Sequence, residues 1–166
     1  MKQKYFFATA MFLLVSVFCY SQENDSEDSV YKKTSFPQFS VVTPDSVWVT
    51  NKSFPAGKPL IFIYFSPDCG HCQLEAQAMY KNIDSFKNAT VLWVSFHPLP
   101  EIKMFKTLYH LDSLPNVIFA RDPKYFLPAY YKVAFTPYIA VYNSEGIFVK
   151  GFRTGAKPEE LIQAIK

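Results

Sequence analysis

Glycine is scarce in this chain, which has five glycines against twelve prolines among 166 residues. This composition excludes a collagen-like repeat and a flexible glycine-rich linker. The three cysteines are too few for a scaffold held together by disulfides. Charge of one sign is not in large excess either, because 17 basic and 14 acidic residues leave a net charge of +3. Since the sequence has no basic run or stripe, we expect no nucleic-acid partner.

Apolar residues, in contrast, are plentiful: 49% of the chain is hydrophobic and 18% is aromatic. That fraction is ordinary for a packed core and too high for a disordered or fibrous chain. The length of 166 residues suits one compact domain with short appendages. The sequence shows no internal repeat and no sign of a second domain.

The first residues have the pattern of an export signal. Lys2 and Lys4 precede an uncharged apolar stretch over 5–18, and small residues follow it. We therefore predict that residues 1–21 are a signal peptide and that the protein is exported to the periplasm or cell envelope. The alternative is an uncleaved membrane anchor. The apolar stretch is shorter than the about 20 residues that a spanning helix needs, so we expect membrane contact only if the segment is retained.

Cleavage after residue 21 would remove Cys19 and leave Cys69 and Cys72 as the cysteines of the mature chain. Export would also place this pair in an oxidising compartment, where a dithiol can cycle. Residues 22–35 are polar and rich in acidic side chains, so we expect a flexible segment there. The compact domain is expected over 36–166.

Within 36–166, short apolar runs alternate with helical patterns. We expect strands over 39–42, 47–50, 60–65, 91–96, 116–120, 138–143 and 147–151. We expect helices after residue 72, over 101–110, over 123–131 with an interruption at Pro128, and over 158–166. In the first of these helices, Leu74, Ala78, Met79, Ile83 and Phe86 form the expected buried side. This order predicts an α/β layered domain with the 60–65 strand buried on both faces.

The chemistry is expected at Cys69-Gly70-His71-Cys72, between a buried strand and a helix. The start of a helix carries partial positive charge and unpaired N–H groups, which stabilise a thiolate. Cys69 would attack a substrate disulfide, and Cys72, one turn further on, would resolve the mixed disulfide. His71 can add positive charge when it is protonated.

Other uses of the cysteine pair are less consistent with the sequence. A zinc site needs two further ligands, and no second cysteine pair supplies them. His97 and His110 have no partners in the pattern, and we expect surface or loop positions for both. Haem attachment needs a histidine after the second cysteine, where this chain has Gln73. A permanent structural disulfide would close only a tiny loop and add little stability. We therefore expect no metal and no cofactor.

Two segments resemble the thioredoxin superfamily, and within it the exported TlpA/ResA-like thiol–disulfide oxidoreductases. The first is 65–75, which includes the cysteine motif, and the second is 135–142, with Glu145-Gly146 downstream. The resemblance extends over 36–166. It implies a thioredoxin-like fold, in which helices flank a central mixed β-sheet, and it implies thiol–disulfide exchange as the activity.

The resemblance also implies roles for individual residues. Cys69 and Cys72 match the nucleophilic and resolving cysteines, and Pro137 matches a cis-proline that faces the disulfide. A cis bond there would leave the Thr136 backbone free to pair with an extended substrate peptide. Glu75 matches an acidic residue beneath the active site that handles the proton of Cys72. The alternative for Glu75 is a first-turn carboxylate stabilised by the helix dipole.

Two positions depart from the family pattern. Asp68 stands where many members have tryptophan, and Ile63 stands where cytosolic thioredoxins have a buried aspartate. An exposed carboxylate at position 68 would disfavour the Cys69 thiolate by less than about 1 kcal/mol. We expect Asp68, Gly70 and His71 to tune the redox couple. Because position 63 offers no proton acceptor, Glu75 becomes more important.

The expected partners are protein thiols or disulfides together with a redox partner protein. The resemblance implies a reductant of envelope proteins, including those of cytochrome c maturation, and we favour that direction. His71 pulls toward an oxidant or isomerase, and reduction potentials in this fold span about −270 to −120 mV.

Two other functions stay open at this point. The first is a peroxiredoxin-like thiol peroxidase, in which Ser66 and Arg121 would supply the hydroxyl and the guanidinium of that family. Phe62 stands where that family has proline. The second is a non-enzymatic binding module that keeps the fold as a scaffold.

Overall fold

The computed structural model describes residues 35–166. The predicted signal peptide and all but the last residue of the predicted polar segment lie outside the described residues. The strands are β1 (Ser40–Val42), β2 (Trp48–Thr50), β3 (Leu60–Tyr64), β4 (Thr90–Ser95), β5 (Val117–Arg121), β6 (Tyr138–Tyr142) and β7 (Phe148–Phe152). The helices are α3 (Gly70–Lys81), α4 (Leu99–Leu108), α5 (Phe126–Tyr130) and α6 (Pro158–Ala164), with 3₁₀ turns η1 (Asn51–Ser53) and η2 (Ile83–Phe86).

Within residues 35–166 the strands form one seven-stranded mixed sheet in the order β2-β1-β5-β4-β3-β6-β7. The central strands β3, β4 and β5 run parallel, whereas β6 runs antiparallel to β3. Each predicted strand agrees with an observed strand to within one residue at either end. The predicted α/β class with a central mixed sheet flanked by helices is therefore confirmed.

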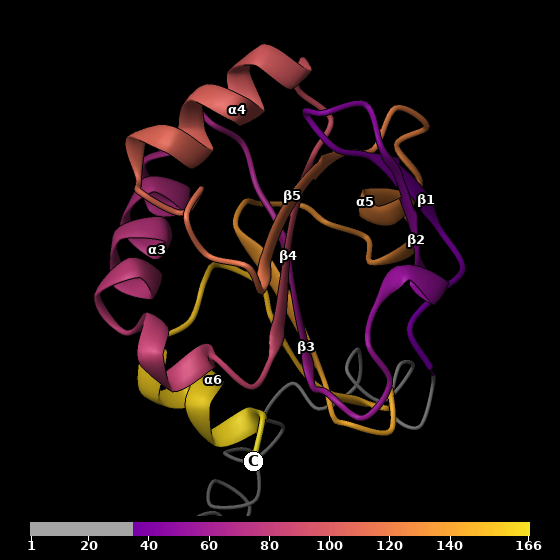
Figure 1. Ribbon diagram of the computed structural model, residues 1–166, viewed down its shortest axis with the longest axis vertical. Coiled ribbons are helices and arrows are strands. Elements are labelled where there is room, and N and C mark those ends of the chain that lie inside the picture. The colour runs from indigo at the N-terminus through magenta and orange to yellow at the C-terminus, as the bar shows by residue number, and fades with distance from the viewer. Residues whose placement is uncertain (1–34) are drawn as a thin grey trace, which may run out of the picture. The chain divides into compact units, whose positions relative to one another are not determined.

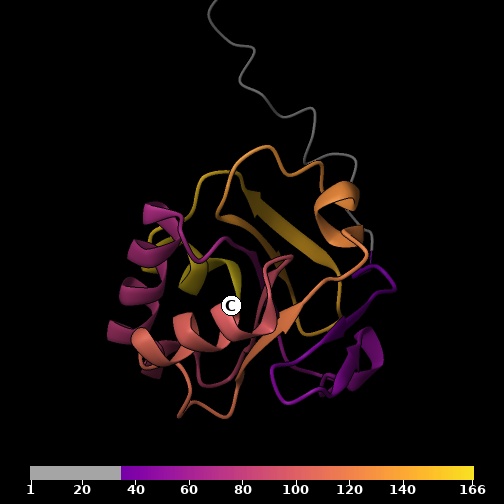
Figure 2. The same ribbon diagram turned by 90° about the horizontal axis from the view of Figure 1, so that it is seen from above.

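Helices α3, α4 and α6 lie on one face of the sheet, and α5 lies on the other (Figure 1 and Figure 2). Ile61, Ile63 and Trp93 belong to the core cluster under α3, α4 and α6. On the opposite face, where α5 lies, Phe62 stacks on Tyr131 at a centroid distance of 5.0 Å. All five residues of β3 are buried, as its continuous apolar run predicts. The strand that leads into the cysteine motif is thus fixed from both sides.

The prediction of which side of α3 is buried was wrong in part. Leu74 is 61% exposed, whereas Cys72, Ala76 and Met79 are buried at the i, i+4, i+7 spacing of one helix face. Leu74 lies two residues before Ala76, which turns it by roughly 200° around the helix away from that face. Glu75, a charged residue, takes the neighbouring buried position.

Helix α5 is shorter than the predicted 123–131. Tyr125 has a left-handed backbone conformation with φ of 56°, so a helix cannot run through it. The buried carboxylate of Asp122 instead accepts a hydrogen bond from the Leu127 backbone N–H at 2.7 Å. Pro128 lies in the first turn of α5. Backbone N–H groups in a first turn have no intrahelical acceptor, so the missing N–H of proline costs the helix no hydrogen bond. None of the helices within 35–166 combines the length and apolar character that crossing a bilayer requires.

Candidate active site

The cysteine motif lies where β3 passes into α3. The backbone N–H of Cys69 donates to the Ser66 carbonyl at 3.1 Å, which closes a turn just before the helix. Cys69 is the N-cap of α3, and the N–H of Gln73 donates to its carbonyl at 3.1 Å. The Gln73 side chain also donates to the Pro67 carbonyl at 3.1 Å. Cys69 is therefore held at the amino end of the helix, as the sequence predicts.

The two thiols differ in exposure. Cys69 is half-buried, whereas Cys72 is fully buried and belongs to the core cluster. The Cys69 thiol donates to the carbonyl of Thr136 at 3.2 Å. The bond between Thr136 and Pro137 is cis. The structure thus brings together four residues that the sequence places in two segments about 65 residues apart.

The surroundings of the thiols shift their pKa values in opposite directions. Burial is the largest single influence on Cys69 and raises its pKa. Hydrogen bonds from the Thr136 side chain, from the backbone and side chain of Cys72 and from the His71 backbone outweigh burial, so the pKa of Cys69 lies below its ordinary value. Burial raises the pKa of Cys72 to about 12. The half-buried sulfur of Cys69 therefore forms a thiolate more readily, and the buried sulfur of Cys72 must be helped to lose its proton.

Glu75 is only 8% exposed and lies one turn after Cys72. Its Oε2 accepts a hydrogen bond from the Ala156 backbone N–H at 3.1 Å. Burial raises the pKa of Glu75 to about 7, and this hydrogen bond only partly opposes the rise. A methyl group on Gly155 would meet Glu75 Oε2 at 2.9 Å and the Pro137 ring at 3.3 Å. Glu75 and Pro137 are therefore neighbours across Gly155.

An open hollow of about 440 Å³ lies beside Glu75. Its lining comes from α3 and from the segment between β7 and α6: His71, Leu74, Glu75, Ala78, Thr154, Gly155, Ala156, Lys157, Pro158 and Glu160. A carboxyl group whose pKa is near 7 and which borders such a hollow can exchange its proton with solvent.

The three candidate tuning residues surround Cys69 in different ways. His71 is exposed on the first turn of α3. A methyl group on Gly70 would meet nothing within 4 Å, so this glycine leaves open space next to Cys69. The Asp68 side chain is 81% exposed, and its pKa lies below the ordinary value because the Ser66 hydroxyl donates to it.

Sequence reasoning missed His97 and Glu101, which are connected to the segment before Cys69 through Ser66. His97 lies in a loop, as predicted, and it has two partners that the sequence pattern does not reveal. Its Nε2 is 2.9 Å from Ser66 Oγ, and its Nδ1 is 2.7 Å from Glu101 Oε2. The i, i+4 spacing of His97 and Glu101 across the start of α4 was the available signal. The contact with Ser66 joins two loops and carries no local signal.

The groups that resemble those of a peroxidase have other partners. The Ser66 hydroxyl is hydrogen-bonded to Asp68 and to His97. The Nε of Arg121 donates to the carbonyl of Phe96 at 3.1 Å. Phe62 points into the layer opposite α3, where it stacks on Tyr131.

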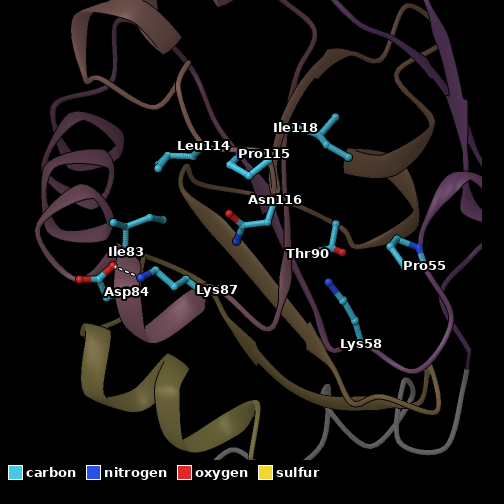
Figure 3. A pocket seen from close by; sticks show the side chains of 10 residues that line it. All are labelled: Pro55, Lys58, Ile83, Asp84, Lys87, Thr90, Leu114, Pro115, Asn116 and Ile118. Atoms are coloured by element: carbon cyan, nitrogen blue, oxygen red, sulfur yellow. Dashed lines mark ion pairs between the residues drawn. The ribbon is translucent and has the colours of Figure 1, made fainter.

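A second hollow, of about 440 Å³, lies near the amino ends of β4 and β5 (Figure 3). Thr90, at the first position of β4, and Asn116, just before β5, line it. Cys69 instead follows the carboxyl end of β3, which runs parallel to β4, so this hollow is separate from the dithiol. Among residues 35–166, no three His, Cys, Asp or Glu side chains are grouped so that they could hold a metal ion.

Residues 33–149 match the family model described as the AhpC/TSA family, which is more than half of the chain. The chain belongs to the AhpC/TSA family. No curated protein sequence gives a significant match.

Solved structures of both redox classes are similar to this AhpC/TSA member. A secreted disulfide oxidoreductase of Mycobacterium tuberculosis, homologous to E. coli DsbE, is 20% identical, with a TM-score of 0.65 over 76% of this chain and 93% of that chain. The M. tuberculosis DsbF structure is 23% identical, with a TM-score of 0.66 over 76% of this chain and 92% of that chain. A peroxiredoxin-like protein from Aquifex aeolicus is 18% identical, with a TM-score of 0.65 over 80% of this chain and 84% of that chain.

At these identities the structural likeness establishes the fold. Together with the family match, it confirms the predicted resemblance to the thioredoxin superfamily and the thioredoxin-like fold. The chain is a thioredoxin-like oxidoreductase. Because this fold serves both disulfide exchange and peroxide reduction, the reaction must be argued from the site itself.

Proposed function

We propose that this protein exchanges thiols and disulfides with protein substrates through Cys69 and Cys72. The observation that carries the proposal is the contrast between the two sulfurs at the start of α3. Cys69 is half-buried with a lowered pKa, and Cys72 is buried with a pKa of about 12. An accessible nucleophile followed by a protected resolving group is the arrangement that the exchange needs.

The first step is attack by the Cys69 thiolate on a substrate disulfide. A bond forms between Cys69 Sγ and one substrate sulfur, and the other substrate sulfur leaves as a thiolate. Glu75 then takes the proton of Cys72, directly or through water in the adjoining hollow. The Cys72 thiolate attacks Cys69 Sγ and releases the substrate sulfur as a second thiolate. Two electrons pass from the dithiol to the substrate, and Cys69 and Cys72 end as a disulfide.

Thr136 is the proposed docking point for the substrate backbone. Its carbonyl lies 3.2 Å from Cys69 Sγ, so a peptide whose sulfur is bonded to Cys69 must pass alongside it. Phe135, the preceding residue, is 71% exposed and offers an apolar contact to such a peptide. Extended pairing of this kind is sequence-tolerant because it uses the main chain.

We favour the reductant direction, with substrates among the proteins of the cell envelope, including those of cytochrome c maturation. The proposal places the protein outside the cytoplasm, consistent with the predicted signal peptide at 1–21 and with the secreted M. tuberculosis relative. In an oxidising compartment the Cys69–Cys72 disulfide needs reduction by a redox partner protein before each further cycle.

The direct test is to trap substrates with Cys72→Ala. Without the resolving sulfur, mixed disulfides at Cys69 should accumulate on exported proteins and disappear when reductant is added. A Cys69→Ala, Cys72→Ala double variant is the matched control and should capture nothing. In parallel, titration of the wild type against glutathione should give a reversible two-electron couple. A protein that traps no partner and shows no such couple would act as a scaffold instead.

The peroxidase alternative has its own test, since peroxiredoxin-like structures share this fold. Stopped-flow measurement should show slow peroxide consumption. The reason is that Ser66 bonds Asp68 and His97, and the Arg121 Nε bonds a backbone carbonyl. Fast consumption that depends on Cys69 would favour the peroxidase and exclude exchange as the main activity.

A further inference from the structure

A chain of hydrogen bonds ties the loop before Cys69 to the loop before α4. Ser66 and Asp68 belong to the first loop, and the Ser66 hydroxyl donates to Asp68 Oδ1. His97 belongs to the second loop, with its Nε2 2.9 Å from Ser66 Oγ. Glu101, in the first turn of α4, holds the other ring nitrogen of His97 at 2.7 Å. The chain of contacts thus runs from α4 to the residue just before the nucleophile.

Counting hydrogens fixes the direction of each contact. Ser66 has one hydroxyl hydrogen and gives it to Asp68, so its oxygen can only accept from His97 Nε2. The Glu101 carboxylate has no hydrogen and accepts from Nδ1. All the contacts are satisfied when both ring nitrogens carry hydrogen, which is the imidazolium form, and His97 then lies between two carboxylates. Nε2 also lies 3.9 Å from Asp68 Oδ1.

Asp68 needs such a restraint. Asp68 immediately precedes Cys69, and its side chain is 81% exposed. Without a tether its carboxylate can therefore adopt other rotamers near Cys69. A negative charge near the sulfur disfavours the thiolate. His97 is firmly placed by comparison, because its side chain is only 18% exposed and its backbone N–H donates to Ser95 Oγ at 3.3 Å.

We infer that His97 is a positioning residue for Cys69: held by Glu101, it keeps the Asp68 carboxylate on Ser66 and offsets its negative charge beside the nucleophile. The inference rests on the proposed exchange reaction, since it assigns His97 a part in setting the reactivity of that nucleophile. His97 acts through Asp68 and does not touch the reacting sulfur atoms.

Ser66, His97 and Glu101 are arranged like a catalytic triad, in which a serine nucleophile contacts a histidine base and the histidine contacts a carboxylate. In such a triad the serine donates its hydrogen to the histidine. Here the Ser66 hydrogen goes to Asp68, which leaves His97 no proton to accept from Ser66. Acyl transfer by Ser66 is therefore the less consistent assignment, and it is one of the outcomes of the test.

The test measures the rate of Cys69 alkylation by iodoacetamide in the reduced protein near pH 7. Only the thiolate reacts, and Cys72 is buried. His97→Asn should slow alkylation about threefold, the scale of one exposed charge interaction. In an Asp68→Asn background the same substitution should leave the rate unchanged, because there is no charge left to offset. His110→Asn is the matched control, since His110 follows the far end of α4, and it should have no effect in either background.

A second measurement is the equilibrium with glutathione. A less stable thiolate makes the dithiol easier to oxidise, so His97→Asn should move the equilibrium about threefold toward the disulfide. A loss of structure alone would not reverse on neutralising Asp68. Where His97→Asn fails to fold, Glu101→Gln carries the same test, because its side chain is 46% exposed and its replacement removes only the anchor of the ring.

Three outcomes overturn the inference. The first is an unchanged alkylation rate in His97→Asn, and the second is an equal slowing with and without Asp68. The third is hydrolysis of p-nitrophenyl acetate that survives Cys69→Ala and disappears with Ser66→Ala, which would make Ser66 a nucleophile. Alkylation requires only the Cys69 thiolate. If Cys72→Ala traps no substrate but the effect of His97→Asn still depends on Asp68, the proposed function is contradicted and the inference about His97 is not.

Discussion

The Glu75 carboxylate in α3 accepts a hydrogen bond at 3.1 Å from the backbone N–H of Ala156, a residue 81 positions later in the chain. This bond joins the helix that carries the dithiol to the segment between β7 and α6. It holds the carboxylate one turn beyond Cys72 and beside the ring of Pro137, across Gly155. The group proposed to accept the Cys72 proton is therefore placed by tertiary structure.

Glu75→Gln should slow the resolution step more than the attack step. The glutamine can still accept from Ala156 but cannot take the proton of Cys72, whose pKa of about 12 leaves very little thiolate at neutral pH. Loss of a positioned base typically costs about a hundredfold or more. Rapid mixing with a disulfide peptide should show mixed-disulfide formation at nearly the wild-type rate and slow release. Equal slowing of both steps would contradict the role given to Glu75, and Glu159→Gln is the surface control.

Glu75 should also make folding stability depend on pH. In the folded protein burial raises its pKa from 4.5 to about 7, so between these values the unfolded chain carries the charge and the folded chain does not. Stability contributed by Glu75 is therefore complete below about pH 4.5 and lost as the pH rises through 7. The difference in pKa corresponds to about 3 kcal/mol.

Urea unfolding of the reduced protein checks this pH dependence. Relative to the wild type, Glu75→Gln should gain about 3 kcal/mol in the free energy of unfolding between about pH 4 and pH 8. Taking the difference between variant and wild type cancels the titration of the exposed carboxyl groups, as the Glu159→Gln variant should confirm. A difference that stays constant over this range would show that Glu75 titrates normally.

Gly155→Ala should both destabilise the protein and disturb Glu75. Gly155 has φ of +94°, and an added methyl group would meet Glu75 Oε2 at 2.9 Å. Gly57→Ala is the matched control, because Gly57 also has a positive φ, +77°, but open space around its Cβ position. Each substitution should cost about 1 kcal/mol or more from backbone strain. Only Gly155→Ala should also slow resolution, measured by the release of the mixed disulfide.

Limited alkylation of the reduced protein should modify Cys69 and spare Cys72. Cys69 is half-buried with a lowered pKa, whereas Cys72 is fully buried with a pKa of about 12. At about pH 8 the rate constants should differ by at least about a hundredfold, since the thiolate fraction falls tenfold for each pH unit below the pKa. Peptide mass mapping of a partly modified sample gives the ratio. Comparable labelling of both would contradict the assignment of attacking and resolving sulfurs.

Much of the fold follows from local pattern. The apolar runs around Ile61, Trp93 and Ile139 predict the central strands because burial on both faces leaves no room for polar side chains. The helix faces are harder to predict, since the sheet and not the helix decides which stripe is covered. Leu74 is exposed and Glu75 buried for this reason, and hydrophobicity alone gives the opposite expectation.

The candidate site likewise has features that follow from local sequence and features that depend on contacts between distant segments. The spacing of Cys69 and Cys72 and their position before a helix are local features, so the sequence predicts the attacking and resolving sulfurs. The contact of Cys69 with Thr136 and the neighbours of Glu75 depend on pairings between distant segments. The bond from His97 to Ser66 joins residues 31 positions apart, and one sequence offers no periodicity that would reveal it.

Cys72 occupies two positions at once, one in the proposed reaction and one in the core shared by Ala76, Met79 and Ile61. The methyl and methylene groups that exclude water from its sulfur also fasten α3 to the sheet. A substitution that loosens this packing would weaken the fold and, by admitting water, bring the sulfur closer to ionising. The stability of the fold and the proposed redox chemistry of Cys72 therefore depend on the same few side chains, and a substitution that changes one is expected to change the other.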